Sequence, residues 1–170
     1  GYGEPRQLFR RALQRLEGDK KTAAAYALAN HLLSHGQRAE GLDLLTRLAA
    51  EQPQAIRPRL VLLELPEVLN DPARAQSLID QIAAVEGSRG VTGPVAQARL
   101  WLRTDKWQGR QQEVESMLQR CLAADPGWSA PVLLLGEMYE KLGRYDEAER
   151  IYRRSIETNP GGRKPAGTSV

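Results

Sequence analysis

Apolar residues recur along this chain at intervals of three and four, the spacing that places side chains on one face of an α-helix. Two such stripes consist of Leu42, Leu45 and Leu48, and of Val114, Met117, Leu118, Cys121 and Leu122. Each stripe is suited to face one neighbouring helix. The pattern therefore predicts an all-α fold in which every helix buries one face.

Glycine and proline mark a repeated unit within this pattern. A glycine precedes a proline by 17 residues in three places, at Gly36 and Pro53, at Gly109 and Pro126, and at Gly143 and Pro160. The glycine permits a tight turn between two antiparallel helices because it tolerates positive φ. The proline ends the second helix because it lacks the N–H that the helix would use. The last two copies lie 34 residues apart by either mark, which predicts a helix–turn–helix unit of that length.

The clearest copy of the unit lies at residues 129–160. It carries Leu135, Gly136, Tyr139, Gly143, Tyr145, Ala148, Tyr152 and Pro160. Residues of these types at these offsets resemble the signature of the tetratricopeptide repeat, with Val132 where that repeat usually has tryptophan. The resemblance implies an α-solenoid of stacked antiparallel helix pairs that form a right-handed superhelix over residues 1–160.

Three earlier copies are expected, at residues 22–55, 56–87 and 95–128. The second departs most from the signature, and we expect Pro66 to kink the first helix of that pair.

Residues 4–17 resemble the second helix of the clearest copy, so we interpret them as the remaining half of a truncated repeat; an ordinary capping helix is the alternative. Residues 161–170 lack apolar periodicity, which predicts a flexible tail. Uncovered ends of such an array would favour self-association.

No group of residues predicts catalysis, a metal site or a cofactor. His31 and His35 stand four apart, but the metalloprotease motif requires an acidic residue directly after the first histidine, where this chain has leucine. Cys121 occupies a small core position and is expected to be an inert thiol. The glycine-rich residues 87–93 lack the Lys-Ser/Thr ending of a phosphate loop and are expected to connect two repeats. We therefore predict that the chain is not an enzyme.

The resemblance implies that ligands contact the first helix of each pair. The implied residues are Tyr26, Asn30, Arg57, Glu64, Glu67, Arg99, Arg103, Lys106, Trp107, Glu137, Glu140 and Lys141. Arg99, Arg103 and Lys106 form the densest cationic strip, because spacings of four and three place them on one helix face. With Trp107 beside them, they are expected to bind an acidic or aromatic peptide. The alternative is a solvated face neutralised by Glu137 and Glu140.

The expected function is therefore that of a protein–protein adaptor, part of a larger protein, which binds a peptide or a partner helix in its concave groove. A net charge of +3 keeps RNA binding open as an alternative, although nucleic-acid binding usually needs a denser basic face. A structural or oligomerisation spacer is the other alternative. No apolar run reaches the roughly 18 residues of a membrane span, and a single cysteine excludes an internal disulfide. A soluble protein of the cytoplasm or the periplasm is compatible with both observations.

Overall fold

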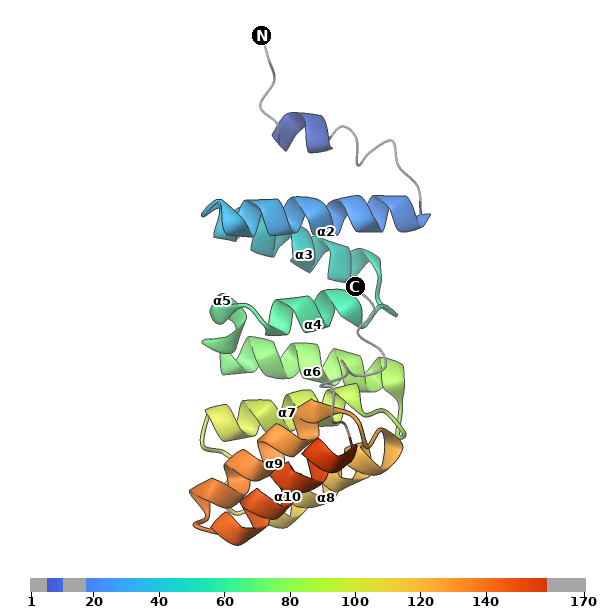
Figure 1. The fold of residues 1–170 in the computed structure, drawn as a ribbon. Coiled ribbons are helices and arrows are strands. Elements are labelled where there is room, and N and C mark those ends of the chain that lie inside the picture. The colour runs from blue at the N-terminus through green and yellow to red at the C-terminus, as the bar shows by residue number, and fades with distance from the viewer. Residues whose placement is uncertain (1–5, 11–17, 159–170) are drawn as a thin grey trace. The chain divides into compact units, whose positions relative to one another are not determined.

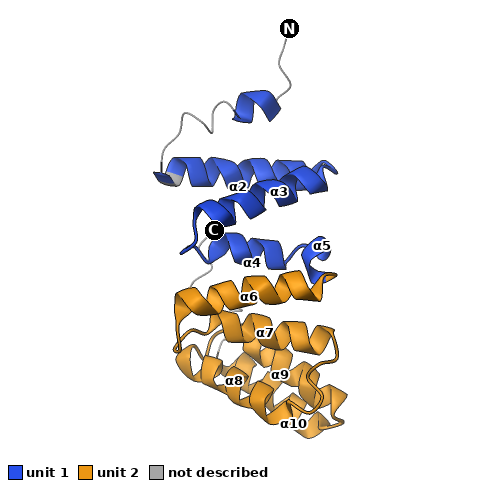
Figure 2. Ribbon diagram, turned by 180° about the vertical axis from the view of Figure 1, so that it is seen from behind, with its two compact units in different colours: residues 1–69 blue, residues 70–170 orange. Residues whose placement is uncertain are grey.

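The computed structural model of the chain describes residues 6–10 and 18–158. Within these residues every regular element is a helix (Figure 1), which confirms the expected all-α class. The chain divides into two compact units, residues 1–69 and residues 70–170 (Figure 2).

Unit 1 is built around a hairpin of two helices, α2 (Gly18–Ser34) and α3 (Arg38–Glu51). The turn between them contains Gly36, whose φ of 78° is one that residues with a side chain rarely adopt. The two helices approach closely at Gly41, because a Cβ added there would lie 2.9 Å from the Cγ of Leu33. The hairpin begins four residues before the range 22–55 that we expected for the first copy.

The next part of unit 1 consists of two short helices, α4 (Arg57–Leu63) and α5 (Pro66–Leu69). Instead of a kink, the structure has a complete break: α4 ends at Leu63, and Pro66 begins α5. Proline is tolerated at a first helical position, where its missing N–H has no intrahelical bond to make. The guanidinium of Arg38 donates two hydrogen bonds to the carboxylate of Glu67, which tie α5 to the start of α3.

Unit 2 contains α6 (Pro72–Glu86), α7 (Thr92–Arg103), α8 (Gln111–Ala124), α9 (Ser129–Lys141) and α10 (Tyr145–Thr158). Each of these helices packs against the next one along the chain, and α7 also contacts α9. The apolar faces of α7 to α10 meet in one core, whose fully buried members include Val114, Leu118, Cys121, Leu135 and Met138. The predicted stripe of α8 therefore lies where the three-and-four spacing placed it.

The pair α9 and α10 shows why the repeat signature has its small and large positions. Tyr152 of α10 lies directly over Gly136 of α9, so that a Cβ at Gly136 would come within 2.1 Å of the ring. Gly143 provides the turn between the two helices with a φ of 72°. The glycine in one helix and the aromatic ring in the other thus fill a single space.

The helix α7 differs from its expected position. It begins at Thr92, three residues before the expected start of the third copy, and ends at Arg103. The carboxylate of Glu86 accepts hydrogen bonds from the backbone N–H groups of Thr92 and Gly93. It thereby caps the new helix from the last turn of α6. The inter-repeat loop expected at residues 87–93 is correspondingly shorter, at 87–91.

The expected leading helix at residues 4–17 is described only in part. Residues 6–10 are helical, and Arg6 and Arg10 pair with Glu40 of α3 at 3.0 and 3.6 Å. The rest of that segment and the expected tail at 161–170 lie outside the described residues. The boundary between the two units falls between α5 and α6, inside the range 56–87 of the expected second copy.

Candidate partner-binding surfaces

In unit 1, the structure brings together two of the expected contact residues, Tyr26 and Arg57. The guanidinium of Arg57 lies over the Tyr26 ring, 4.3 Å from its centre, in a cation–π contact. Tyr26 is buried while Arg57 stays exposed. Burial raises the pKa of the Tyr26 hydroxyl, and the nearby Arg57 charge lowers it in part. Asn30 on α2 and Glu64 just after α4 are exposed.

Glu67 belongs to the scaffold of unit 1. Its carboxylate accepts the two hydrogen bonds from Arg38, and this interaction lowers the pKa of the Glu67 carboxyl. A ligand would have to displace Arg38 to reach it. We therefore leave Glu67 out of the candidate surface.

In unit 2, Arg99 and Arg103 stand one turn apart on α7. Both Arg99 and Arg103 are exposed. Neither forms an ion pair with a carboxylate of residues 6–10 or 18–158. Lys106 is also exposed, but it follows the end of α7 and lies in the loop of residues 104–110. The expected cationic helix face therefore consists of Arg99 and Arg103, with Lys106 in the adjoining loop.

Trp107 lies in the core instead of on the exposed face that we expected for it. Only 6% of the residue is exposed, and it belongs to the same buried cluster as Leu118 and Tyr139. The reason is that α7 stops at Arg103 and Asp105 adopts a positive φ of 56°, so the loop differs from the continued helix that we assumed. Within the described residues the indole N–H of Trp107 has no hydrogen-bond partner. Trp107 is thus not available for stacking on a peptide.

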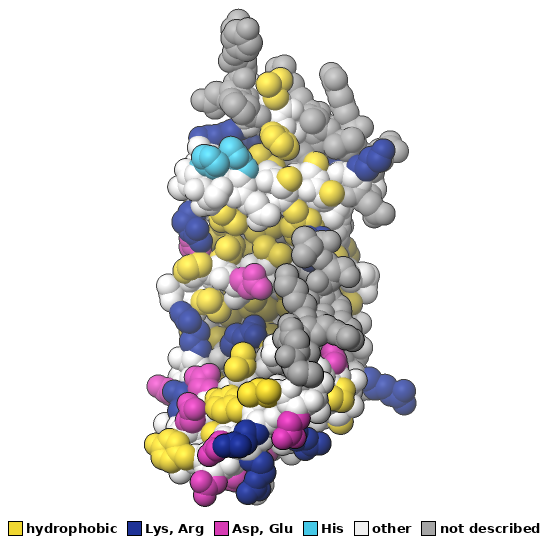
Figure 3. Space-filling view, in the orientation of Figure 1, with side chains coloured by type: hydrophobic (Ala, Val, Ile, Leu, Met, Phe, Trp, Pro, Cys, Tyr) yellow, Lys and Arg dark blue, Asp and Glu magenta, His cyan; other side chains and the backbone are white. Residues whose placement is uncertain are grey.

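The exposed face of α9 carries Leu133, Glu137, Glu140 and Lys141. Glu140 accepts a long hydrogen bond of 3.5 Å from the hydroxyl of Tyr152. Among the described residues, no ion pair joins Glu137 or Glu140 to the cations of α7. Acidic, basic and hydrophobic side chains are mixed over the face that shows α9 and α10 (Figure 3).

One polar network of unit 2 was not expected from the sequence. Tyr139 donates a hydrogen bond of 2.7 Å to Glu115 of α8, and the Arg144 guanidinium lies 4.8 Å from the centre of the Tyr139 ring. Burial and the hydrogen bond to Glu115 raise the pKa of Tyr139 to about 12. Arg144 also pairs with Glu147. These contacts join α8, α9 and α10 at one end, so we assign them a structural role.

The two histidines lie side by side on the surface, in cyan in Figure 3, with ring centres 4.1 Å apart. His35 Nδ1 lies 2.8 Å from the carbonyl oxygen of His31. No third metal ligand joins them, since the described residues contain no group of three potential ligands. Cys121 is buried, and burial raises the pKa of its thiol. No described helix combines the length and the apolar character needed to cross a bilayer.

Residues 132–164 match the sequence profile of the tetratricopeptide repeat. The fold is similar to that of TTC0263, a thermophilic TPR protein of Thermus thermophilus, with 23% identity, a TM-score of 0.62, and coverage of 91% of this chain and 81% of that one. It is also similar to MamA, with 12% identity, a TM-score of 0.60, and coverage of 88% and 83%.

A second structure of MamA, labelled AMB-1, has 18% identity, a TM-score of 0.54, and coverage of 88% and 80%. A search of curated proteins found no match. At these identities the structural likeness defines the fold, and the profile match defines the repeat. The chain therefore has the fold of these tetratricopeptide-repeat structures, and residues 132–164 match that repeat in sequence as well.

Proposed function

We propose that this chain is a protein-docking module that binds an acidic segment of a partner protein at Arg99, Arg103 and Lys106. Tetratricopeptide-type repeats stack helix pairs into extended surfaces that suit protein partners. The observation that supports this site is the pair of guanidinium groups on α7, neither of which has an ion-pair partner among the described residues. By contrast, seven other arginines pair with a described carboxylate, namely Arg6, Arg10, Arg38, Arg47, Arg110, Arg144 and Arg153.

The spacing of Arg99 and Arg103 determines the kind of ligand. Residues four apart on a helix have Cβ atoms about 5–6 Å from each other, so the two guanidinium groups can bind neighbouring carboxylates of one peptide. Each contact would be a charge-assisted hydrogen bond. Because the side chains reach solvent, we expect them to govern the association rate and the choice of partner more than the total affinity.

Two further surfaces are proposed as contacts for the same class of partner. In unit 1, Arg57 is already held over Tyr26, with Asn30 on α2 and Glu64 just after α4 as further polar contacts. In unit 2, Glu137 and Lys141 follow the exposed Leu133 of α9 at successive four-residue intervals. An acidic peptide with an apolar residue would contact Leu133 through that residue and Lys141 through a carboxylate. Glu137 would repel a peptide that places a further carboxylate next to it.

The test of this proposal is a double charge reversal, Arg99→Glu with Arg103→Glu. We expect it to weaken binding of a fluorescein-labelled peptide rich in Asp and Glu by at least about ten-fold, as two favourable contacts become repulsive. The control is Arg47→Glu with Arg153→Glu. It changes the net charge by the same amount as the test variant, but at α3 and α10 instead of α7. Fluorescence anisotropy measures the affinity, and circular dichroism shows that each variant remains folded.

Equal affinity of the two double variants would contradict the proposal. The same titration with a labelled single-stranded RNA tests the nucleic-acid alternative. Affinity for RNA that exceeds the affinity for the peptide, and that falls steeply with salt, would assign the surface to RNA instead.

A further inference from the structure

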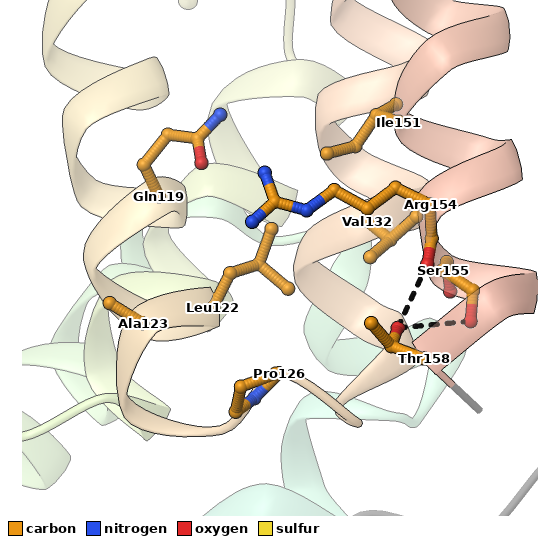
Figure 4. A pocket seen from close by; sticks show the side chains of 9 residues that line it. All are labelled: Gln119, Leu122, Ala123, Pro126, Val132, Ile151, Arg154, Ser155 and Thr158. Carbon is orange, nitrogen blue, oxygen red and sulfur yellow. Dashed lines mark hydrogen bonds between the residues drawn. The ribbon is translucent and has the colours of Figure 1, made fainter.

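A small cavity opens in unit 2 between the second helices α8 and α10 (Figure 4). It forms because both helices pack on α9 while making little contact with each other. Its volume is about 200 Å³, below the roughly 300–1,000 Å³ of pockets that enclose a small molecule. A cavity of this size suits one anchoring side chain of a larger partner.

The most buried side chains of the lining are aliphatic, and the polar residues Gln119, Ser155 and Thr158 also line the cavity. Val132 of α9 and Ile151 of α10 are 4% and 9% exposed, and Leu122 of α8 is half-buried beside them. Because α8, α9 and α10 all contribute aliphatic side chains, the lining is held in place by the packing of three helices. Binding of an aliphatic side chain here would remove its apolar surface from water, which is favourable.

Arg154 is the single cation among the described residues that line the cavity. Arg154 extends from α10 across the cavity, with its guanidinium toward Gln119 and Leu122 (Figure 4). Arg154 has no carboxylate partner among the described residues, and no carboxylate lines the cavity. Arg153, its neighbour on the same helix, is instead paired with Glu149 at 2.7 Å. Arg150, one turn before Arg154, is exposed and likewise forms no ion pair within the described part of the chain.

We propose that this cavity anchors an aliphatic side chain of an acidic peptide segment, with Arg154 holding a carboxylate next to that side chain. A cavity that has aliphatic side chains at its most buried positions and, in its lining, one cation unpaired among the described residues is complementary to a segment in which leucine and glutamate alternate. Arg150, one turn away on α10, adds a second positive charge near the cavity. The site lies on second helices and does not involve Arg99 or Arg103, so it does not depend on the function proposed above.

The experiment follows the methyl signals of Leu122, Val132 and Ile151 by NMR. The probe is a short fluorescein-labelled peptide in which leucine alternates with glutamate, added to the full chain. We expect these signals to shift in the wild type and in the Arg99→Glu, Arg103→Glu variant. The variant Ser155→Leu fills the cavity from α10 and is expected to abolish the shifts. Arg154→Gln should weaken binding about five-fold, whereas the matched control Arg153→Gln should leave it unchanged.

The proposal would be overturned if the peptide bound without shifting these methyl signals, or bound equally well to the Ser155→Leu variant. A variant that ends at Thr158 tests whether the chain itself occupies the site. Two results together would show that the residues after Thr158 occupy the cavity and that the assignment to a partner is wrong. The first is that this variant binds the peptide more tightly than the full chain does, and the second is that its methyl signals differ from those of the full chain without peptide. Methyl shifts that appear on raising the protein concentration alone would assign the cavity to a second copy, which also contradicts the proposal.

Discussion

Arg59 carries a positive charge into the interior of unit 1, where only 4% of the residue is exposed. Its guanidinium donates hydrogen bonds to the carbonyl oxygens of Ala49, Gln52 and Ala55, at 3.1, 3.1 and 2.7 Å. These acceptors lie in the last turn of α3 and just beyond it, where a helix has unpaired carbonyls and the negative end of its dipole. One side chain of α4 thus satisfies the end of the preceding helix.

We predict that Arg59→Met lowers the free energy of unfolding of unit 1 by about 2–4 kcal/mol, because it removes the Arg59 donors from the carbonyl oxygens of Ala49 and Ala55. Methionine keeps much of the length and apolar contact of the arginine stem. The control is Arg57→Met, an exposed substitution two residues away that should cost less than about 1 kcal/mol. Urea denaturation followed by circular dichroism measures both. If the two variants were equally stable, the capping role of Arg59 would be wrong.

Single residues are also where sequence reasoning was least complete. Periodicity treats an arginine as a polar surface position, so it has no means of identifying Arg59 as a buried cap. The predicted exposed position of Trp107 was wrong for a related reason. We placed Trp107 by its offset within the repeat, and that offset assumes that α7 continues as far as residue 107. The placement of Arg99 and Arg103 one turn apart did follow from the helical pattern, because both lie inside the helix as it forms.

At the scale of elements, the glycine and proline marks located the turns and the second helices more reliably than the first helices. The loop between α9 and α10 is residues 142–144, whereas the loop between α7 and α8 is residues 104–110. The first helix of the third copy, α7, therefore lies closer to the N-terminus than expected, whereas its second helix, α8, begins soon after Gly109 as expected. The cap from Glu86 sets the start of α7, and it comes from the preceding element, which a signature of one repeat does not include.

We predict that Glu86→Ala destabilises unit 2 by about 1–2 kcal/mol, since it removes a charged acceptor from two N–H groups at a helix start. Hydrogen exchange at the amides of Thr92 and Gly93 should become faster than at the centre of α7. Glu157→Ala is the comparison, because Glu157 is exposed on α10 and pairs with no described cation. Unchanged protection at Thr92 and Gly93 would show that α7 needs no cap from α6.

At the scale of the whole molecule, the division into two units falls within the part of the chain that matched the repeat signature least. There, α4 and α5 are short, and Pro66 interrupts them. In a repeat protein each unit contacts only its neighbours, so stability is approximately a sum of local terms. Residues 56–87 depart most from the signature, but the sequence alone predicted neither the break at Pro66 nor the boundary between the units.

We predict that the two units lose structure separately. Arg59→Met should lower hydrogen-exchange protection in α3 and α4 and leave the protection of α9 and α10 at its wild-type level. Residues 64–71 should exchange through openings that cost less free energy than those of either unit's core. Native-state hydrogen exchange resolved by residue measures all three regions. A uniform loss of protection across both units would instead mean that the chain unfolds as one cooperative body.

The placement of the indole rings has a practical consequence. All three tryptophans of the chain, Trp101, Trp107 and Trp128, lie in unit 2 and are buried or half-buried against its core. Intrinsic tryptophan emission therefore reports on that unit alone, while far-ultraviolet dichroism reports on the helices of both. The difference between the melting curve followed by tryptophan emission and the one followed by dichroism therefore reports the unfolding of unit 1. No label or substitution is needed.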